Sequence, residues 1–181
     1  YYPEFLPDVT RPSGLPYSTT SARGDLSESF GTLRYGQLLE VLLYDVRRTL
    51  SVGELNAAFL DSNVEDWLVR RTASQDTRHL VHVPSNPPGW TAGKWGEWYP
   101  DALHPETGQL TTQIPKAHWQ QGWLDQHDRI MQSLADMKHR NPLVIAGDLH
   151  ATGVGTMHGA GNLDFSDNPI TNILCGPVGT S

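Results

Sequence analysis

The segment of residues 142–151, PLVIAGDLHA, limits the possible folds of this chain more than any other part of it. An apolar run between a proline and a glycine is typical of a short buried strand. Gly147 is expected to let the backbone turn, and Asp148 and His150 follow at the carboxyl end of the strand, where ligands of open α/β sheets bind. An oxygen ligand beside an imidazole nitrogen suits Zn, Fe or Mn, so the pattern predicts a metal site. The alternative is a plain turn, with Asp148 as a helix cap and His150 at the surface.

Polar side chains also follow two other predicted strands, which span residues 38–44 and 77–83. The residues concerned are Asp45, Arg47, Ser85 and Asn86. Because the carboxyl ends of parallel strands meet at one edge of a sheet, we expect these side chains to share a site with the Asp148 region. The guanidinium of Arg47 suits an anionic substrate oxygen, which it can hold in a bidentate manner. The alternative for Arg47 is a structural ion pair with Asp45 or another carboxylate.

Helical patterns separate the predicted strands. A helix is predicted to begin at Ser62, because Ser62 and Glu65 match the S-x-x-E capping box. Residues 120–140 place apolar side chains at the spacing of an amphipathic helix, and Pro142 prevents its continuation. A last strand is predicted over residues 170–175. Strands that alternate with helices in this way indicate an α/β fold.

Charge and composition exclude several classes of protein. The chain of 181 residues has 20 acidic and 13 basic side chains, and its net charge of −7 argues against a nucleic-acid-binding surface as its main role. No apolar run approaches the ~20 residues that a membrane-spanning helix needs. A single cysteine excludes a disulfide within the chain.

Two segments of the chain show no periodic spacing of apolar residues. Residues 1–36 are rich in Pro, Gly, Ser and Thr, and we expect an irregular amino-terminal segment there, followed by one domain over residues 37–181. Residues 89–119 form a long loop with several tryptophans, which is typical of a lid or a binding loop. His118 in this loop is a candidate for substrate contact. The chain lacks an initiator Met and a signal-like start, so we expect it to be a piece of a longer protein.

Four pieces of the chain, taken in order, resemble the carboxyl-terminal half of a PhoD-like (alkaline phosphatase D-type) metallophosphoesterase. They are LLYDVR at 42–47, DWL at 66–68 with residues 74–83, LVIAGDLH at 143–150, and residues 168–177. The G-D-x-H piece is the most specific, because it stands where broader metallophosphoesterases have G-H-x-H.

The resemblance implies that this chain is the carboxyl-terminal half of a two-sheet α/β/β/α sandwich. It also implies that the protein hydrolyses phosphoric esters, as a phosphatase or phosphodiesterase, and is secreted or periplasmic. Asp148 and His150 become ligands of two or more metal ions, which are iron with calcium or other divalent cations. The implied catalytic residues are Arg47 and His150, and the implied contacts of a small phosphate ester are Arg47, Asn86 and His118.

The chain departs from the PhoD-like pattern in two respects. The family's other ligands lie in amino-terminal motifs of the form G-D-x-x-Y and D-D-H-E, which this chain lacks, so we expect the isolated chain to be inactive. The predicted strand at 77–83 is followed by Ser85 and Asn86, where PhoD-like sequences more usually have a Gln. Two alternatives stay open: a non-catalytic α/β binding module, and a degenerate family member that has lost its metals.

Overall fold

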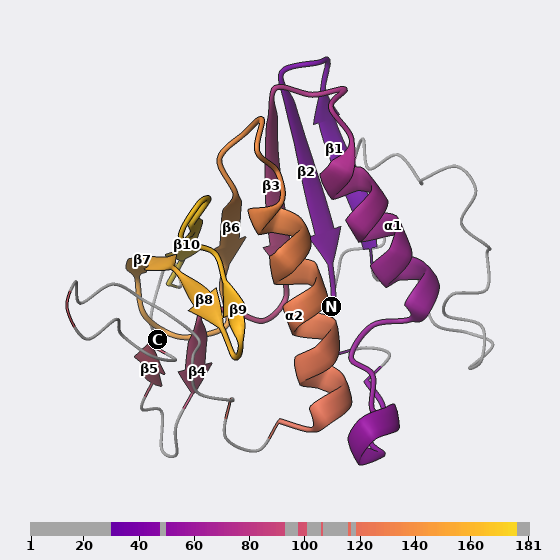
Figure 1. Cartoon of the computed structure of the whole chain (residues 1–181), viewed down its shortest axis with the longest axis vertical. Coiled ribbons are helices and arrows are strands. Elements are labelled where there is room, and N and C mark those ends of the chain that lie inside the picture. Colours follow the sequence, from indigo (N-terminus) through magenta and orange to yellow (C-terminus); the bar gives the residue numbers. More distant parts are fainter. Residues whose placement is uncertain are drawn as a thin grey trace.

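A six-stranded sheet forms the centre of the fold (Figure 1). The computed structural model describes residues 30–47, 50–92, 98–100, 106, 116 and 119–176. In spatial order the strands are β1 (Phe30–Tyr35), β2 (Leu39–Tyr44), β3 (His79–Pro84), β6 (Leu143–Ala146), β10 (Ile170–Leu174) and β7 (Gly153–Met157). The central strands β2, β3, β6 and β10 are parallel, whereas β1 and β7 pair antiparallel at the two edges.

Two helices, α1 (Ser62–Ala73) and α2 (Gln121–Ala135), lie side by side on one face of this sheet (Figure 1). α1 connects β2 to β3, and α2 connects β3 to β6, which is the next strand across. Right-handed crossovers that step in one direction place both helices on the same face. The predicted α/β class is therefore confirmed, and the carboxyl ends of β2, β3 and β6 lie at one edge. Within the described residues, no helix is long and apolar enough to span a bilayer.

The hydrophobic core lies between the two helices and the sheet. Alternate strand residues point toward the helices, and Leu42, Leu80 and Val144 are at most 2% exposed. They pack against helix side chains that recur at helical spacing, such as Leu68 on α1 and Leu134 on α2. This arrangement follows from the period of two in strands and of ~3.6 in helices that the sequence shows.

The first strand corrects one expectation from the sequence. Residues 30–35, which we expected within an irregular segment, form β1, while residues 1–29 lie outside the described part of the chain. β1 pairs with β2 along its whole length across a tight turn, in which Gly36 has a φ of +56°. The apolar pattern of β1 is weak, because as an edge strand it buries only its first residues. β1 is therefore a strand because of its backbone pairing with β2, and its sequence pattern alone does not show it.

Smaller elements complete the described structure. They are the 3-10 helix η2 (Glu54–Asn56) and two two-stranded sheets, β4 (Trp90–Ala92) with β5 (Trp98–Pro100) and β8 (Gly159–Ala160) with β9 (Leu163–Asp164).

The start of α1 differs by one residue from the predicted capping box. The helix cap is Asp61, whose carboxylate accepts a hydrogen bond from Asn63 N at 2.9 Å. Glu65 does not reach back to the helix start. It is 7% exposed and accepts hydrogen bonds from Arg129 Nη2 at 3.1 Å and Gln126 Nε2 at 2.8 Å, which join α1 to α2. The local pattern assigned Glu65 to the helix cap, but in the structure its side chain binds α2 instead.

His82 in β3 is fully buried between the sheet and α1. The hydroxyl of Thr72 donates to Leu68 O at 2.7 Å, so its oxygen accepts from His82 Nε2 at 2.9 Å. His82 Nδ1 is then the acceptor for the Tyr44 hydroxyl at 3.2 Å. These bonds suit a neutral imidazole, and burial, followed by the charge of Arg140, lowers the pKa of His82 to about 3.

We expect the free energy of unfolding to fall as the pH is lowered from 6.5 toward 3. The folded state binds a proton at His82 less well than the unfolded state does, so protonation favours unfolding in this window. The effect is at most about 1.4 kcal/mol per pH unit. His82→Gln should flatten this dependence, whereas His79→Gln, at an exposed position on the same strand, should leave it unchanged. Thermal unfolding at several pH values measures this dependence. If the free energy of unfolding changes equally with pH in the wild type and in His82→Gln, the prediction is wrong.

Candidate functional site

The carboxyl ends of β2, β3 and β6 are linked by the side chain of Arg47. Its Nη1 donates to Asp148 Oδ1 at 3.0 Å, and its Nη2 donates to Ser85 O at 3.2 Å. Arg47 and Asp148 are 101 positions apart in the sequence. The shared edge that the strand order predicts therefore brings these side chains together.

Asp45 and Ser85 hold the turn that presents Arg47. Ser85 Oγ donates to Asp45 Oδ1 at 3.0 Å and accepts from Val46 N at 2.9 Å. Asp45 Oδ1 also accepts from Arg47 N at 2.8 Å. The sequence placed Asp45 and Ser85 at strand ends but gave neither a role. Only the packing of β2 beside β3 shows that they position Arg47.

Arg47 keeps donors for a ligand. A guanidinium has five N–H donors, and those bound to Asp148 and Ser85 are a minority of them. The Arg47 side chain is 53% exposed. An ion pair at such an exposed position adds at most about 1 kcal/mol to stability, so the pair with Asp148 is weak evidence for a purely structural role.

The backbone at Asp148 is strained. Its φ of +74° lies in the left-handed region, whereas Gly147, which we expected to supply the turn, does not have a positive φ. Asp tolerates this region better than most residues do, at a cost of about 1–2 kcal/mol. Strained residues of this kind gather at functional sites, where the surrounding structure maintains them.

We expect Asp148→Gly to be more stable than Asp148→Ala by about 1 kcal/mol, because both remove the carboxylate and only glycine removes the strain. Denaturant unfolding of the two variants measures the difference. The same pair made at Asp76, an exposed residue without a positive φ, should show no such advantage for glycine. An alanine variant of Asp148 as stable as the glycine variant would contradict the assignment of strain to this position.

The described residues do not form a metal centre on their own. Asp148 is paired with Arg47, and His150 is exposed and makes no hydrogen bond or ion pair with the described part of the chain. No group of three or more His, Cys, Asp or Glu side chains comes together among the residues that the structure describes. The predicted pair of ligands, Asp148 and His150, therefore lacks a third one here.

Asn86 and His118 were the remaining predicted contacts of a substrate. Asn86 follows β3 beside Ser85, and its buried Oδ1 has no hydrogen-bond partner among the residues that the structure describes. An atom with almost no solvent-accessible surface is covered by the protein itself, so Oδ1 is not the atom of Asn86 that contacts a substrate. His118 lies outside the described residues.

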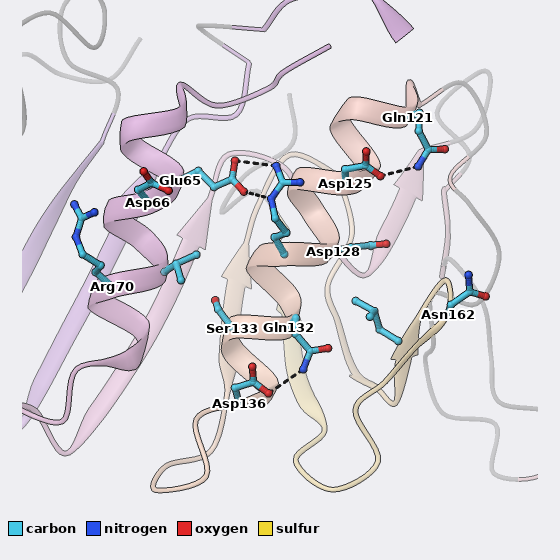
Figure 2. Close-up of a pocket in the computed structure, with 13 residues that line it drawn as sticks. Glu65, Asp66, Arg70, Gln121, Asp125, Asp128, Gln132, Ser133, Asp136 and Asn162 are labelled. Carbon is cyan, nitrogen blue, oxygen red and sulfur yellow. Dashed lines mark hydrogen bonds and ion pairs between the residues drawn. The ribbon is translucent and has the colours of Figure 1, made fainter. Parts of the chain in front are cut away.

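A groove of about 1030 Å³ between α1 and α2 is a different surface (Figure 2). It contains none of the predicted site residues. Its carboxylates are Glu65, Asp66, Asp125, Asp128 and Asp136. Several of its side chains are bonded to one another, as Figure 2 shows for Gln121 with Asp125 and Gln132 with Asp136. Its negative charge disfavours a phosphate ester, so the candidate site is the strand edge with Arg47.

Comparison with solved structures finds a likeness to "Structure of PhoD", with a TM-score of 0.56 and 17% sequence identity. The match covers 90% of this chain and 31% of that chain, so this chain spans about a third of the solved protein. No protein-family model and no curated protein matches the chain. At this level of identity the likeness shows the fold: the described α/β structure resembles part of PhoD.

Proposed function

We propose that the protein containing this chain hydrolyses phosphoric esters and that the edge formed by β2, β3 and β6 binds the phosphoryl group. The observation that supports this most is the position of Arg47, which is held by Ser85 and paired with Asp148 at the carboxyl ends of the strands. This is the edge at which open α/β sheets bind their ligands. The likeness of the fold to part of PhoD supports the same class of activity.

In this proposal the chain's own side chains bind and orient the ester. The free N–H groups of Arg47 donate to phosphoryl oxygens and stabilise the negative charge that develops on them. The side-chain amide of Asn86, which follows β3 beside Ser85, is the second proposed contact of the ester. His150 is exposed at the same strand end, where its imidazole nitrogen is available as a metal ligand.

Metal ions belong to the proposal, but the described residues cannot hold them alone. Asp148 and His150 would be part of a larger ligand set, with the other ligands supplied from outside the described residues. Asp148 would then have to leave its ion pair with Arg47 or share its carboxylate between the two. Bound metal ions would supply an activated water and a positive charge for the phosphoryl group.

A phosphate-binding protein without catalysis is the second candidate. The free N–H groups of Arg47 support it, because a guanidinium can bind a phosphoryl group without a metal ion. In that case Arg47 and Asn86 bind the same phosphoryl group, and no turnover follows. Both candidates predict binding of phosphate at this edge, so only an activity measurement separates them.

The decisive experiment measures hydrolysis of p-nitrophenyl phosphate and bis-p-nitrophenyl phosphate by the intact protein, with and without a chelator. We expect release of nitrophenol that the chelator abolishes and added divalent cations restore. Phosphate binding without turnover under all conditions would support the second candidate. Hydrolysis that survives the chelator would contradict the dependence on metal.

A further inference from the structure

Residues 85–90, here called the strap, run from the end of β3 to the start of β7. The strap leaves β3 at Ser85, and the indole ring of Trp90 covers Gly153, the first residue of β7, where an added Cβ would lie 3.0 Å from Trp90 Cη2. β6 and β10 lie between β3 and β7 in the sheet, and Gly153 is level with their carboxyl ends. Residues 87–89 are buried. The strap is therefore a buried part of the edge at which the candidate site lies.

His127 of α2 connects the strap to the helix that packs over it. The residue is 4% exposed, and its Nε2 lies 3.3 Å from Pro88 O. Its Nδ1 lies 2.9 Å from Asp128 Oδ1. The ring is also in edge contact with Trp119, with the two ring centroids 5.8 Å apart. Because Pro88 is only two positions after Asn86, a bond from His127 to Pro88 O fixes the part of the strap that adjoins the candidate site.

Both hydrogen-bond partners of the His127 ring are acceptors. A backbone carbonyl and an ionised carboxylate have no proton to donate, so both ring nitrogens must carry one, and only the imidazolium meets this condition. A neutral ring has a single N–H. The bond to the carboxylate of Asp128 is the shorter and the charge-assisted one, so a neutral ring keeps its proton on Nδ1. Loss of one proton from His127 therefore breaks the bond to Pro88 O and leaves the bond to Asp128.

The charged groups around His127 leave this choice of nitrogen to Asp128. The strap has no ionisable side chain. Lys116 Nζ lies over the ring of Trp119, 5.1 Å from its centroid, and the edge contact with His127 is made by that same ring. The turn at Gly161 approaches the carboxylate, since a Cβ there would lie 3.5 Å from Asp128 Oδ2. Within the described residues, Asp128 is thus the carboxylate that is bonded to His127.

We propose that His127 is a pH-sensitive positioning residue, which tethers the strap when its ring is doubly protonated and releases it when the ring is neutral. The tethered strap holds Ser85, whose carbonyl oxygen accepts from Arg47 Nη2 at 3.2 Å, and the neighbouring Asn86. Release loosens both proposed contacts of the ester, so binding weakens as the pH rises. Histidine makes this change of charge between about pH 5 and 8. The effect on the ester rests on the proposed function, whereas the tether itself does not.

Nitrogen-15 NMR of the His127 ring in the intact protein tests the tether independently of activity. We expect protons on both nitrogens at about pH 5.5 and on Nδ1 alone at about pH 8.5. In Asp128→Asn the amide can donate to Nδ1, so the neutral ring should carry its proton on Nε2 and keep the bond to Pro88 O. The control is Asp125→Asn, about one turn earlier on α2 (Figure 2), which should behave as the wild type does. A ring that stays in one protonation state over this range, or the same neutral form in the wild type and Asp128→Asn, would overturn the tether.

The KM for bis-p-nitrophenyl phosphate, whose charge does not change over this pH range, tests the effect on the site. We expect the KM of the wild type and of Asp125→Asn to rise about two- to tenfold from about pH 5.5 to about 8.5, which is the effect of one hydrogen bond. Asp128→Asn should lose this pH dependence. His127→Phe keeps a ring beside Trp119 but has no N–H, so its KM should be high at both pH values.

The outcomes separate the positioning role from the proposed function. An equal rise of KM in the wild type and Asp128→Asn would overturn the positioning role of His127 and leave the proposed function standing. If the ester binds without turnover, its Kd takes the place of KM in the same comparison. Absence of both binding and turnover would contradict the proposed function and the positioning role with it, while the NMR result would still decide whether His127 tethers the strap.

Discussion

Replacement of Arg47 by lysine should lower kcat/KM for phosphate esters by about 10- to 100-fold. Lysine keeps the charge but loses the planar fork, so it cannot bind Asp148, Ser85 O and a phosphoryl oxygen at the same time. The free energy of unfolding should change by less than about 1 kcal/mol, because the ion pair is exposed. Kinetics of the intact protein with the nitrophenyl esters, together with thermal unfolding, measure both effects.

The control for this variant is Arg34→Lys. Arg34 is also a partly exposed arginine with an ion pair, to Asp76 at 3.0 Å, and it lies in β1 away from the candidate site. Arg34→Lys should retain the activity of the wild type. An unchanged rate for Arg47→Lys would show that Arg47 is a structural ion pair with Asp148, which is the alternative that the sequence left open.

Gly122→Ala should destabilise the protein by about 2–4 kcal/mol. Alanine usually stabilises a helix relative to glycine by about 1 kcal/mol, so the helical pattern of α2 alone predicts the opposite sign. In the structure, a Cβ on Gly122 would lie 2.1 Å from Ala57 O and 2.9 Å from Ala57 N. These are backbone atoms that cannot rotate away, so α2 has to move from the segment that precedes α1.

Gly147→Ala is the matched control for stability. A Cβ at Gly147 would lie 3.7 Å from Cys175 O, which is an ordinary contact, and its φ is not in the left-handed region. Denaturant unfolding should therefore show a change of less than about 1 kcal/mol for this variant. If Gly122→Ala is as stable as the wild type, α2 does not pack against Ala57 as described.

The sequence determined the α/β class and the edge at which the candidate site lies. The apolar runs at 38–44 and 143–146 predicted strands, because hydrophobic periodicity is a local property that burial on a sheet requires. His79 and His82 are three positions apart in the strand predicted at 77–83, so alternation places them on opposite faces, and the structure shows that His82 is the buried one. Polar residues directly after these strands identified the edge with Arg47 and Asp148.

Only the tertiary structure decided which side chains are partners. The bond between Arg47 and Asp148 joins positions 101 apart, and no local pattern encodes it. Glu65 is a second example: the local pattern predicted a capping box, but its carboxylate binds Arg129 and Gln126 of α2. β1 is a third, because its apolar pattern is weak and it forms a strand through its pairing with β2. Periodicity is fixed by neighbours in the chain, whereas ion pairs and edge strands depend on which distant segments the fold brings into contact.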